Sequence, residues 1–191
     1  MSMLNLQALQ AAELHTDPFD YMVVPGFLSP EVVARVNADY PAIETAANHE
    51  LDKLQYGPAF GALMEELRGP AFATLLGERF DMELASLPTT VSVRKFCERT
   101  DGNIHTDHKS KVITVLVYFN EQWEHADGQL RLLRSKDDIE DYAAQVPPRA
   151  VNPFPINSEI HDMVSMDTEC RSWNNSQFDL YNWRYHRLTE S

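Results

Sequence analysis

A histidine and a carboxylate lie one residue apart just before an apolar stretch of the chain. They are His105 and Asp107, and the apolar stretch covers 112–119. Side chains at positions i and i+2 of a strand point to the same side, so the two groups can bind one cation together. Joined by one more histidine, they would form the facial triad that holds non-haem Fe(II) and leaves coordination positions open. The alternative is a solvated loop histidine that happens to lie beside an aspartate.

The residues around this pair predict strands that would position it. Residues 112–119 have the β-branched and aromatic content of a buried strand, and after a polar turn a shorter strand is expected over 129–133. The pattern over 89–99 predicts another strand, and a turn follows it just before His105. Its Arg94 either points into the enclosed side of the sheet to meet an acidic ligand, or lies on the surface of an edge strand.

The N-terminal part of the chain predicts helices that pack on one side of this sheet. A short helix is expected over 3–14, followed by a strand over 21–24. A second helix should begin at Ser29 and Pro30, since a capping side chain precedes a residue tolerated at the first helical position. Further helical patterns cover 60–69 and 70–80, the latter with a loose turn at Gly77, and a short helix is expected over 135–144.

The region from 17 to 148 resembles the 2-oxoglutarate and Fe(II)-dependent oxygenases of the prolyl 4-hydroxylase-like group. The resemblance implies a mainly β protein with N-terminal helices and a double-stranded β-helix, or jelly-roll, core. A single domain over 1–191 would have its helical part at about 1–85 and its core at about 86–191. The matching residues are His105, Thr106, Asp107, Lys111, Thr114, Leu116, Tyr118, Asn120, Asp127, Gly128, Gln129, Leu130, Arg131 and Leu132.

The resemblance also implies a set of cofactors and site residues. Fe(II) would be held by His105 and Asp107, 2-oxoglutarate and O2 would be cosubstrates, and ascorbate could assist. Tyr118 and Thr114, on one face of their strand, could contact 2-oxoglutarate; packing in the core is the alternative for both. His108 and His125 are expected at the surface or just outside the metal ligands, rather than as ligands themselves. The substrate, a peptide or a small molecule, has no readable code in the sequence.

Beyond about residue 149 the chain departs from the family pattern. Pro153 and Pro155 remove backbone donors that a central strand would use. Read as written, the sequence offers His161 as the third metal ligand. Arg171 follows about ten residues later, where family members carry a base that binds the far carboxylate of 2-oxoglutarate through paired hydrogen bonds. The alternatives are a loop histidine and a solvated arginine.

A shifted reading frame offers a different explanation of this departure. If the last base of each codon is joined to the first two of the next, Val164 and Ser165 can encode Phe. The following junctions, through Met166 and Asp167 to Thr168, can encode His, Gly and His. The shifted text Phe-His-Gly-His contains the His-Gly-His in which the distal histidine of the family often occurs. One hypothesis is therefore that a frameshift near Arg149 has replaced the native C-terminus, leaving an inactive jelly-roll protein without the full triad.

Composition limits the remaining classes of function. With 16 Lys and Arg against 29 Asp and Glu, the formal net charge is -13, which argues against general nucleic-acid binding. Two cysteines, Cys97 and Cys170, are too few for a disulfide framework and predict a cytoplasmic protein with free thiols. No apolar run approaches the roughly 20 residues of a membrane span. A cupin-like metal-binding module without a cosubstrate is a further alternative.

Overall fold

The structure is a computed structural model of the 191-residue chain. It describes residues 2–96, 104–105, 110–123 and 128–149, and the backbone alone for residue 106 and for the strands at 154–157, 163–166 and 177–186. Within this described part, every helix is too short or too polar to cross a lipid bilayer.

Four α-helices and one 3-10 turn make up most of the N-terminal part. They are α1 (Leu6–Ala11), α2 (Pro30–Ala38), η1 (Leu51–Lys53), α3 (Pro58–Leu67) and α4 (Pro70–Phe80). The Ser29 hydroxyl accepts a hydrogen bond from the Val32 N–H at 3.3 Å, so the predicted cap of α2 is confirmed. The helix expected over 3–14 is shorter, and the strand expected over 21–24 is reduced to one bridge between His15 and Tyr21.

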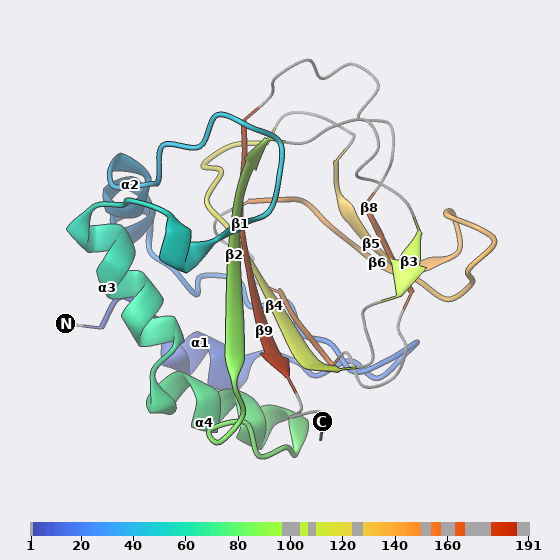
Figure 1. The fold of residues 1–191 in the computed structure, drawn as a ribbon. Coiled ribbons are helices and arrows are strands. Elements are labelled where there is room, and N and C mark those ends of the chain that lie inside the picture. The colour runs from blue at the N-terminus through green and yellow to red at the C-terminus, as the bar shows by residue number, and fades with distance from the viewer. Residues whose placement is uncertain are drawn as a thin grey trace.

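The strands form two antiparallel sheets (Figure 1). The five-stranded sheet has the order β1-β2-β9-β4-β7, and the four-stranded sheet has the order β3-β8-β5-β6. Their bounds are β1 (His49–Glu50), β2 (Thr89–Phe96), β3 (His105–Thr106), β4 (Lys111–Tyr118), β5 (Leu130–Leu133), β6 (Tyr142–Val146), β7 (Phe154–Asn157), β8 (Met163–Met166) and β9 (Gln177–His186).

Strand β4 separates two apolar clusters because its residues alternate between the faces of the five-stranded sheet. On one face Ile113, Val115 and Val117 join the main core, which the helices cover as predicted. On the other face Leu116 and Tyr118 join a smaller cluster with residues of the four-stranded sheet. We call this second face, which points toward the four-stranded sheet, the inner face.

A bulge at the start of β4 changes which residues reach the inner face. The pairing of β4 with β9 shifts between Lys111 and Ile113, so Val112 is the extra residue. Val112 and Ile113 both pack in the main core. Two successive residues therefore lie on the helix side, and Lys111 falls on the same inner face as Thr114.

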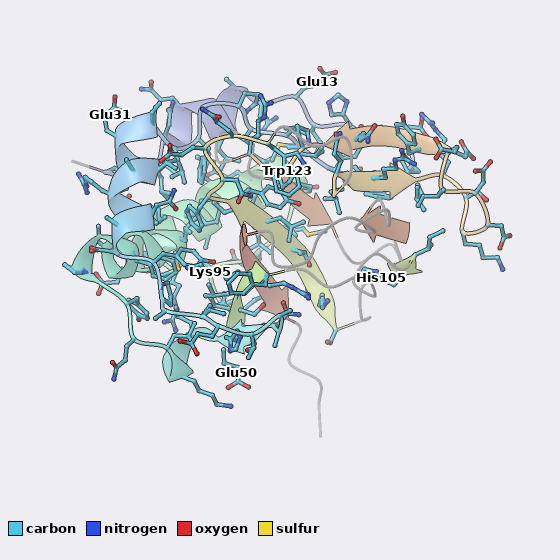
Figure 2. All side chains as sticks on the ribbon, turned by 90° about the horizontal axis from the view of Figure 1, so that it is seen from above. Glu13, Glu31, Glu50, Lys95, His105 and Trp123 are labelled. Atoms are coloured by element: carbon cyan, nitrogen blue, oxygen red, sulfur yellow. The ribbon has the colours of Figure 1, made fainter. Side chains whose placement is uncertain are left out.

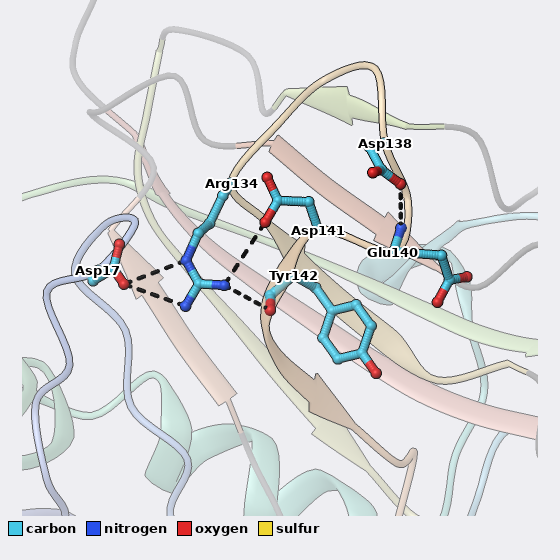
Figure 3. A network of polar contacts seen from close by, with 6 residues as sticks. All are labelled: Asp17, Arg134, Asp138, Glu140, Asp141 and Tyr142. Atoms are coloured by element: carbon cyan, nitrogen blue, oxygen red, sulfur yellow. Dashed lines mark hydrogen bonds and ion pairs between the residues drawn. The ribbon is translucent and has the colours of Figure 1, made fainter.

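The helix predicted over 135–144 is wrong, because this segment forms the turn and second strand of the β5–β6 hairpin. Arg134 organises the turn, as Figure 3 shows. Its guanidinium donates to the Tyr142 carbonyl at 2.9 Å and pairs with Asp17 at 3.3 Å and Asp141 at 3.9 Å. These contacts tie the segment before Phe19 to the hairpin, and they outweigh the local helical pattern of the acidic run.

The loose turn expected at Gly77 is also wrong, since α4 continues to Phe80. The carbonyl of Gly77 accepts a hydrogen bond from the Met82 N–H at 2.9 Å, after Asp81 adopts the left-handed conformation (φ 54°). A Cβ at Gly77 would meet the Met82 carbonyl oxygen at 2.4 Å. This glycine is therefore required by the close return of the chain after the helix.

Candidate functional site

His105 lies on β3, at the end of the molecule remote from α2 and its Glu31 (Figure 2). Its backbone is in register with Val164 of β8, which is in register with Leu132 of β5. Residues opposite each other in antiparallel strands point to the same face. Leu132 packs in the same cluster as Tyr118, so His105 faces the space between the two sheets. Its side chain is exposed there, at an open end.

Several predicted site residues lie outside the described part of the chain. They are Asp107, His161 and Arg171, together with the histidines at 108 and 125. Among the described residues alone, no three His, Cys, Asp or Glu side chains gather closely enough to hold a metal ion. His105 is thus the one predicted metal ligand whose position the structure gives.

Thr114 and Tyr118 share the inner face of β4, as expected from their spacing. Their exposed fractions are 3% and 1%. Around Tyr118 the cluster between the sheets is formed by Phe19, Tyr21, Leu116, Trp123, Leu130, Leu132 and Val146. This apolar surrounding would strengthen any hydrogen bond or ion pair made beside Tyr118, because few water molecules can screen it.

The pKa of Tyr21, a member of this cluster, is raised. Burial is the largest cause, the charge of Arg134 opposes it, and the charge of Asp17 adds to it. The phenol of Tyr21 therefore stays neutral at physiological pH and contributes no negative charge to the space between the sheets.

Arg94 of β2 lies on the inner face rather than on the helix side. Its neighbour Val93 is fully buried in the main core, and alternation places the next residue on the opposite face. The guanidinium Nε of Arg94 donates to the Phe96 carbonyl at 2.9 Å, and the Arg94 carbonyl accepts from the Tyr40 hydroxyl at 2.8 Å. Both contacts fix the arginine at the end of the strand.

Two further basic positions on this face were not assigned a role from the sequence. Lys111 is only 9% exposed, which is rare for lysine. Arg184 of β9 is in register with Thr90 on one side and Thr114 on the other. The alternating residue types over 177–186 could have predicted a strand there. They could not have predicted that this strand pairs with β2 and β4, which are distant in the sequence.

Among the described inner positions of β2 and β4 the charged residues are basic, whereas Glu50 of β1, in register with the inner position Ser92, is acidic and pairs with Lys53 at 2.8 Å. Arg94 and Lys111 are basic, and the other inner positions of β2 and β4 whose side chains are described are Thr90, Ser92, Thr114, Leu116 and Tyr118. The chain as a whole carries a formal net charge of -13. An acidic protein that keeps cations on an internal sheet face has the electrostatics to bind an anion there.

Comparisons by sequence find no relative: neither a protein-family model nor a curated protein matches the chain.

Comparisons by structure find several. The fold is similar to a prolyl-4-hydroxylase from Pseudomonas putida, at 18% identity over 96% of this chain and 97% of that one, with a TM-score of 0.58. It is similar to HygX from Streptomyces hygroscopicus with iron bound, at 10% identity over 90% and 83% of the two chains, with a TM-score of 0.57. Another HygX structure, with nickel and 2-oxoglutarate bound, matches at 13% identity over 87% and 82%, with a TM-score of 0.52.

A third similar protein is an oxidoreductase of the 2OG-Fe(II) oxygenase family from Burkholderia pseudomallei. It matches at 10% identity over 88% of this chain and 85% of that one, with a TM-score of 0.56. At these identities the likeness concerns the fold, and it agrees with the resemblance carried by the residues around His105. The chain therefore has the fold of the prolyl 4-hydroxylase-like 2-oxoglutarate and Fe(II)-dependent oxygenases.

Proposed function

We propose that the chain is a 2-oxoglutarate and Fe(II)-dependent oxygenase, and that its core is a jelly roll. The observation that carries the proposal is the position of His105, which faces the space between the sheets at an open end of the fold. Proteins with this fold include HygX, whose structures hold iron or 2-oxoglutarate. An imidazole at that place is one of the three groups that a facial triad needs.

The order of the strands supports the jelly roll. With β1 set aside, one sheet has the order β2-β9-β4-β7 and the other has the order β3-β8-β5-β6. From β2 to β5 the chain changes sheet at every strand, and from β6 to β9 it does so again. This alternation is what a double-stranded β-helix requires, and it leaves a space between the sheets that is open at one end.

The pairing of β3 with β8 supports a triad of His105, Asp107 and His161. Thr106, the last residue of β3, is in register with Met163, the first residue of β8. Asp107 is the next residue after the end of β3, and His161 comes two positions before the start of β8. Because the strands are antiparallel, the chain leaves β3 where it enters β8, so Asp107 and His161 both lie close in sequence to this end of the strand pair.

The proposed roles follow from chemistry and position. A neutral imidazole from each histidine and the carboxylate of Asp107 would hold Fe(II) and leave positions open for 2-oxoglutarate and O2. Bound there, these groups supply the oxidative decarboxylation of 2-oxoglutarate to succinate and the hydroxylation of a C–H bond of a peptidyl or small-molecule substrate. Tyr118 and Thr114 would contact 2-oxoglutarate from the inner face, and Arg171 would bind its far carboxylate.

Anaerobic titration of the folded protein with Fe(II) and 2-oxoglutarate tests the proposal. We expect a weak visible absorption band that requires both, and release of succinate when O2 is admitted. The matched control replaces 2-oxoglutarate with succinate, which lacks the keto group needed for chelation. If folded protein gives neither the band nor succinate, the inactive jelly-roll alternative is favoured instead.

A further inference from the structure

We propose that a surface cavity beside the start of β2 binds a small zwitterion, a molecule of the size of a free amino acid with one carboxylate and one ammonium group. The cavity has a volume of about 170 Å³ and lies between η1, the C-terminal end of α3 and the first residues of β2. No described residue of the proposed iron site lines it, and Glu50 at its edge lies well apart from His105 in Figure 2. The inference is therefore independent of the proposed function.

The cavity exists because β1 is short. β1 is in register with β2 only at Val93 and Ser92. From Leu51 the chain turns into η1 instead of continuing along β2, which leaves a space beside Thr89–Val91. Arg68, the C-cap residue of α3, lines the same space. Residues of a helix end, a 3-10 turn and a strand therefore form its walls.

The walls of the cavity carry one cation and one anion that a ligand can reach. The Arg68 guanidinium and the Asp52 carboxylate both line the cavity and are exposed, and neither makes a hydrogen bond or ion pair with any described residue. Glu50, the other acid in the lining, is already paired with Lys53 at 2.8 Å. A zwitterion can satisfy both remaining charges, whereas a simple acid or a simple amine satisfies only one.

The floor of the cavity favours a ligand with a small apolar side chain. Leu51 is only 3% exposed, and Val91 is half-buried and packs against the main core. The hydroxyl of Thr89, also in the lining, can donate or accept one hydrogen bond. A cavity of about 150 Å³ can hold a molecule the size of benzene, so this one suits a single branched amino acid.

The test uses L-valine and two analogues that each lack one charge. 3-Methylbutanoate is valine without the ammonium group, and 2-methylpropylamine is valine without the carboxylate. In amide NMR spectra of isotope-labelled protein, valine should give saturable shifts at Leu51–Lys53, Arg68 and Thr89–Val91, with a Kd on the order of 1 mM. Each analogue should bind about three- to fivefold more weakly, the size of one exposed ion pair.

Two variants assign each charge of the ligand to its partner. In Arg68→Gln, valine and 2-methylpropylamine should bind equally, because the carboxylate has lost its cation. In Asp52→Asn, valine and 3-methylbutanoate should bind equally. The matched control is Arg35→Gln, which removes an exposed arginine from the last turn of another helix, α2, and should bind valine like the wild type. The amide spectrum of each variant also establishes that it is folded.

The inference is overturned if valine gives no saturable shifts around the cavity, or if it binds no more tightly than the two analogues. It is also overturned if Arg68→Gln weakens all three compounds equally, because the arginine would then support the local structure rather than the carboxylate. Saturable shifts only elsewhere in the protein overturn it as well. Since these titrations contain neither Fe(II) nor 2-oxoglutarate, their outcome leaves the proposed function to its own experiment.

Discussion

At the scale of single residues, the face on which a side chain lies decides whether it can take part in the chemistry. His105 shares a row with Leu132, so it faces the inter-sheet space although its side chain is exposed. Ile113 and Val115 lie next to candidate site residues on β4, yet they face the helices. One step along a strand therefore separates a potential ligand from a core residue.

The assignment of His105 predicts a difference between two neighbouring histidines. His105→Ala should abolish retention of Fe(II), because a facial triad with one ligand removed binds the metal far more weakly. His108→Ala should leave retention nearly intact. Metal content after gel filtration in the presence of Fe(II) measures both. Equal losses in the two variants would mean that the wrong imidazole has been assigned.

Glu66 on α3 makes a contact distant in sequence that predicts a pH dependence. Its carboxylate accepts hydrogen bonds from the Ser2 hydroxyl at 2.6 Å and from the Met3 N–H at 2.9 Å. Partial burial by itself raises the pKa of Glu66, but these hydrogen bonds and one from the Leu4 N–H outweigh it, and the pKa is lowered from 4.5.

A lowered pKa in the folded state stabilises the protein above the unfolded pKa, and the stabilisation is lost as the pH falls through the folded value. Glu66→Gln should therefore lower the free energy of unfolding by on the order of 1 kcal/mol at pH 7, a size limited by solvent exposure. The difference should shrink as the pH falls below the unfolded value of about 4.5, and it should vanish well below the lowered folded pKa, where the carboxyl group is protonated in both states. Urea unfolding at several pH values measures it, and a difference independent of pH would contradict the assignment.

At the scale of elements, two helical glycines predict opposite results for the same substitution. A Cβ at Gly77 would meet the Met82 carbonyl oxygen at 2.4 Å, and backbone cannot easily move. A Cβ at Gly61 would meet only the edge of the Tyr56 ring at 3.2 Å, and Tyr56 is 41% exposed. The two sites therefore separate the effect of packing from the effect of helix propensity.

Gly77→Ala should destabilise the protein by roughly 1–3 kcal/mol, the usual range for overpacking. Gly61→Ala should be neutral or stabilising by up to about 1 kcal/mol, because alanine loses less conformational entropy in a helix. Thermal and urea unfolding of both variants measure the pair. A stabilised Gly77→Ala would show that the chain after α4 can move away from the helix.

The sequence predicted correctly those helices and strands that are determined by neighbouring residues, such as a helix cap or an apolar run. Ser29 and the proline after it mark the start of α2, and the apolar run after His105 marks β4. The segment 135–144 was predicted wrongly because its structure is set by contacts outside it. Arg134 bonds to Asp17, which is far away in sequence, and β6 pairs with β5. Such contacts override the helical pattern that the segment has by itself.

At the scale of the whole molecule, the fold could be predicted from the sequence, and so could the candidate metal-binding pair, but not the basic positions on the inner face. The pair His105 and Asp107 stands beside a strand with a strong pattern, so the resemblance was readable there. No role was assigned to Lys111 or to the position of Arg184 on the inner face, because a bulge sets the first and the pairing of distant strands sets the second. His161 as the third metal ligand and Arg171 as the base for the far carboxylate stay predictions.

The C-terminal strand bears on whether the coding frame is intact. Strand β9 lies between β2 and β4 in the five-stranded sheet. It has Tyr181 and Trp183 at positions in register with valines of the main core, and Asn182 and Arg184 at positions in register with the inner face. This alternation is expected of a strand selected for this place. We therefore expect the frame to be correct at least over 177–186.

A pair of substitutions tests this expectation on the protein. Because position 183 is in register with Val115 of the main core, Trp183→Ala is expected to cost about 3 kcal/mol of unfolding free energy. Asn182→Ala, one step along the strand, should cost less than about 1 kcal/mol, because it leaves the main core intact. If both are neutral, the tail does not close the fold in this register and the frameshift hypothesis gains support. Resequencing the coding DNA then decides, because an uninterrupted frame without the shifted Phe-His-Gly-His removes that hypothesis.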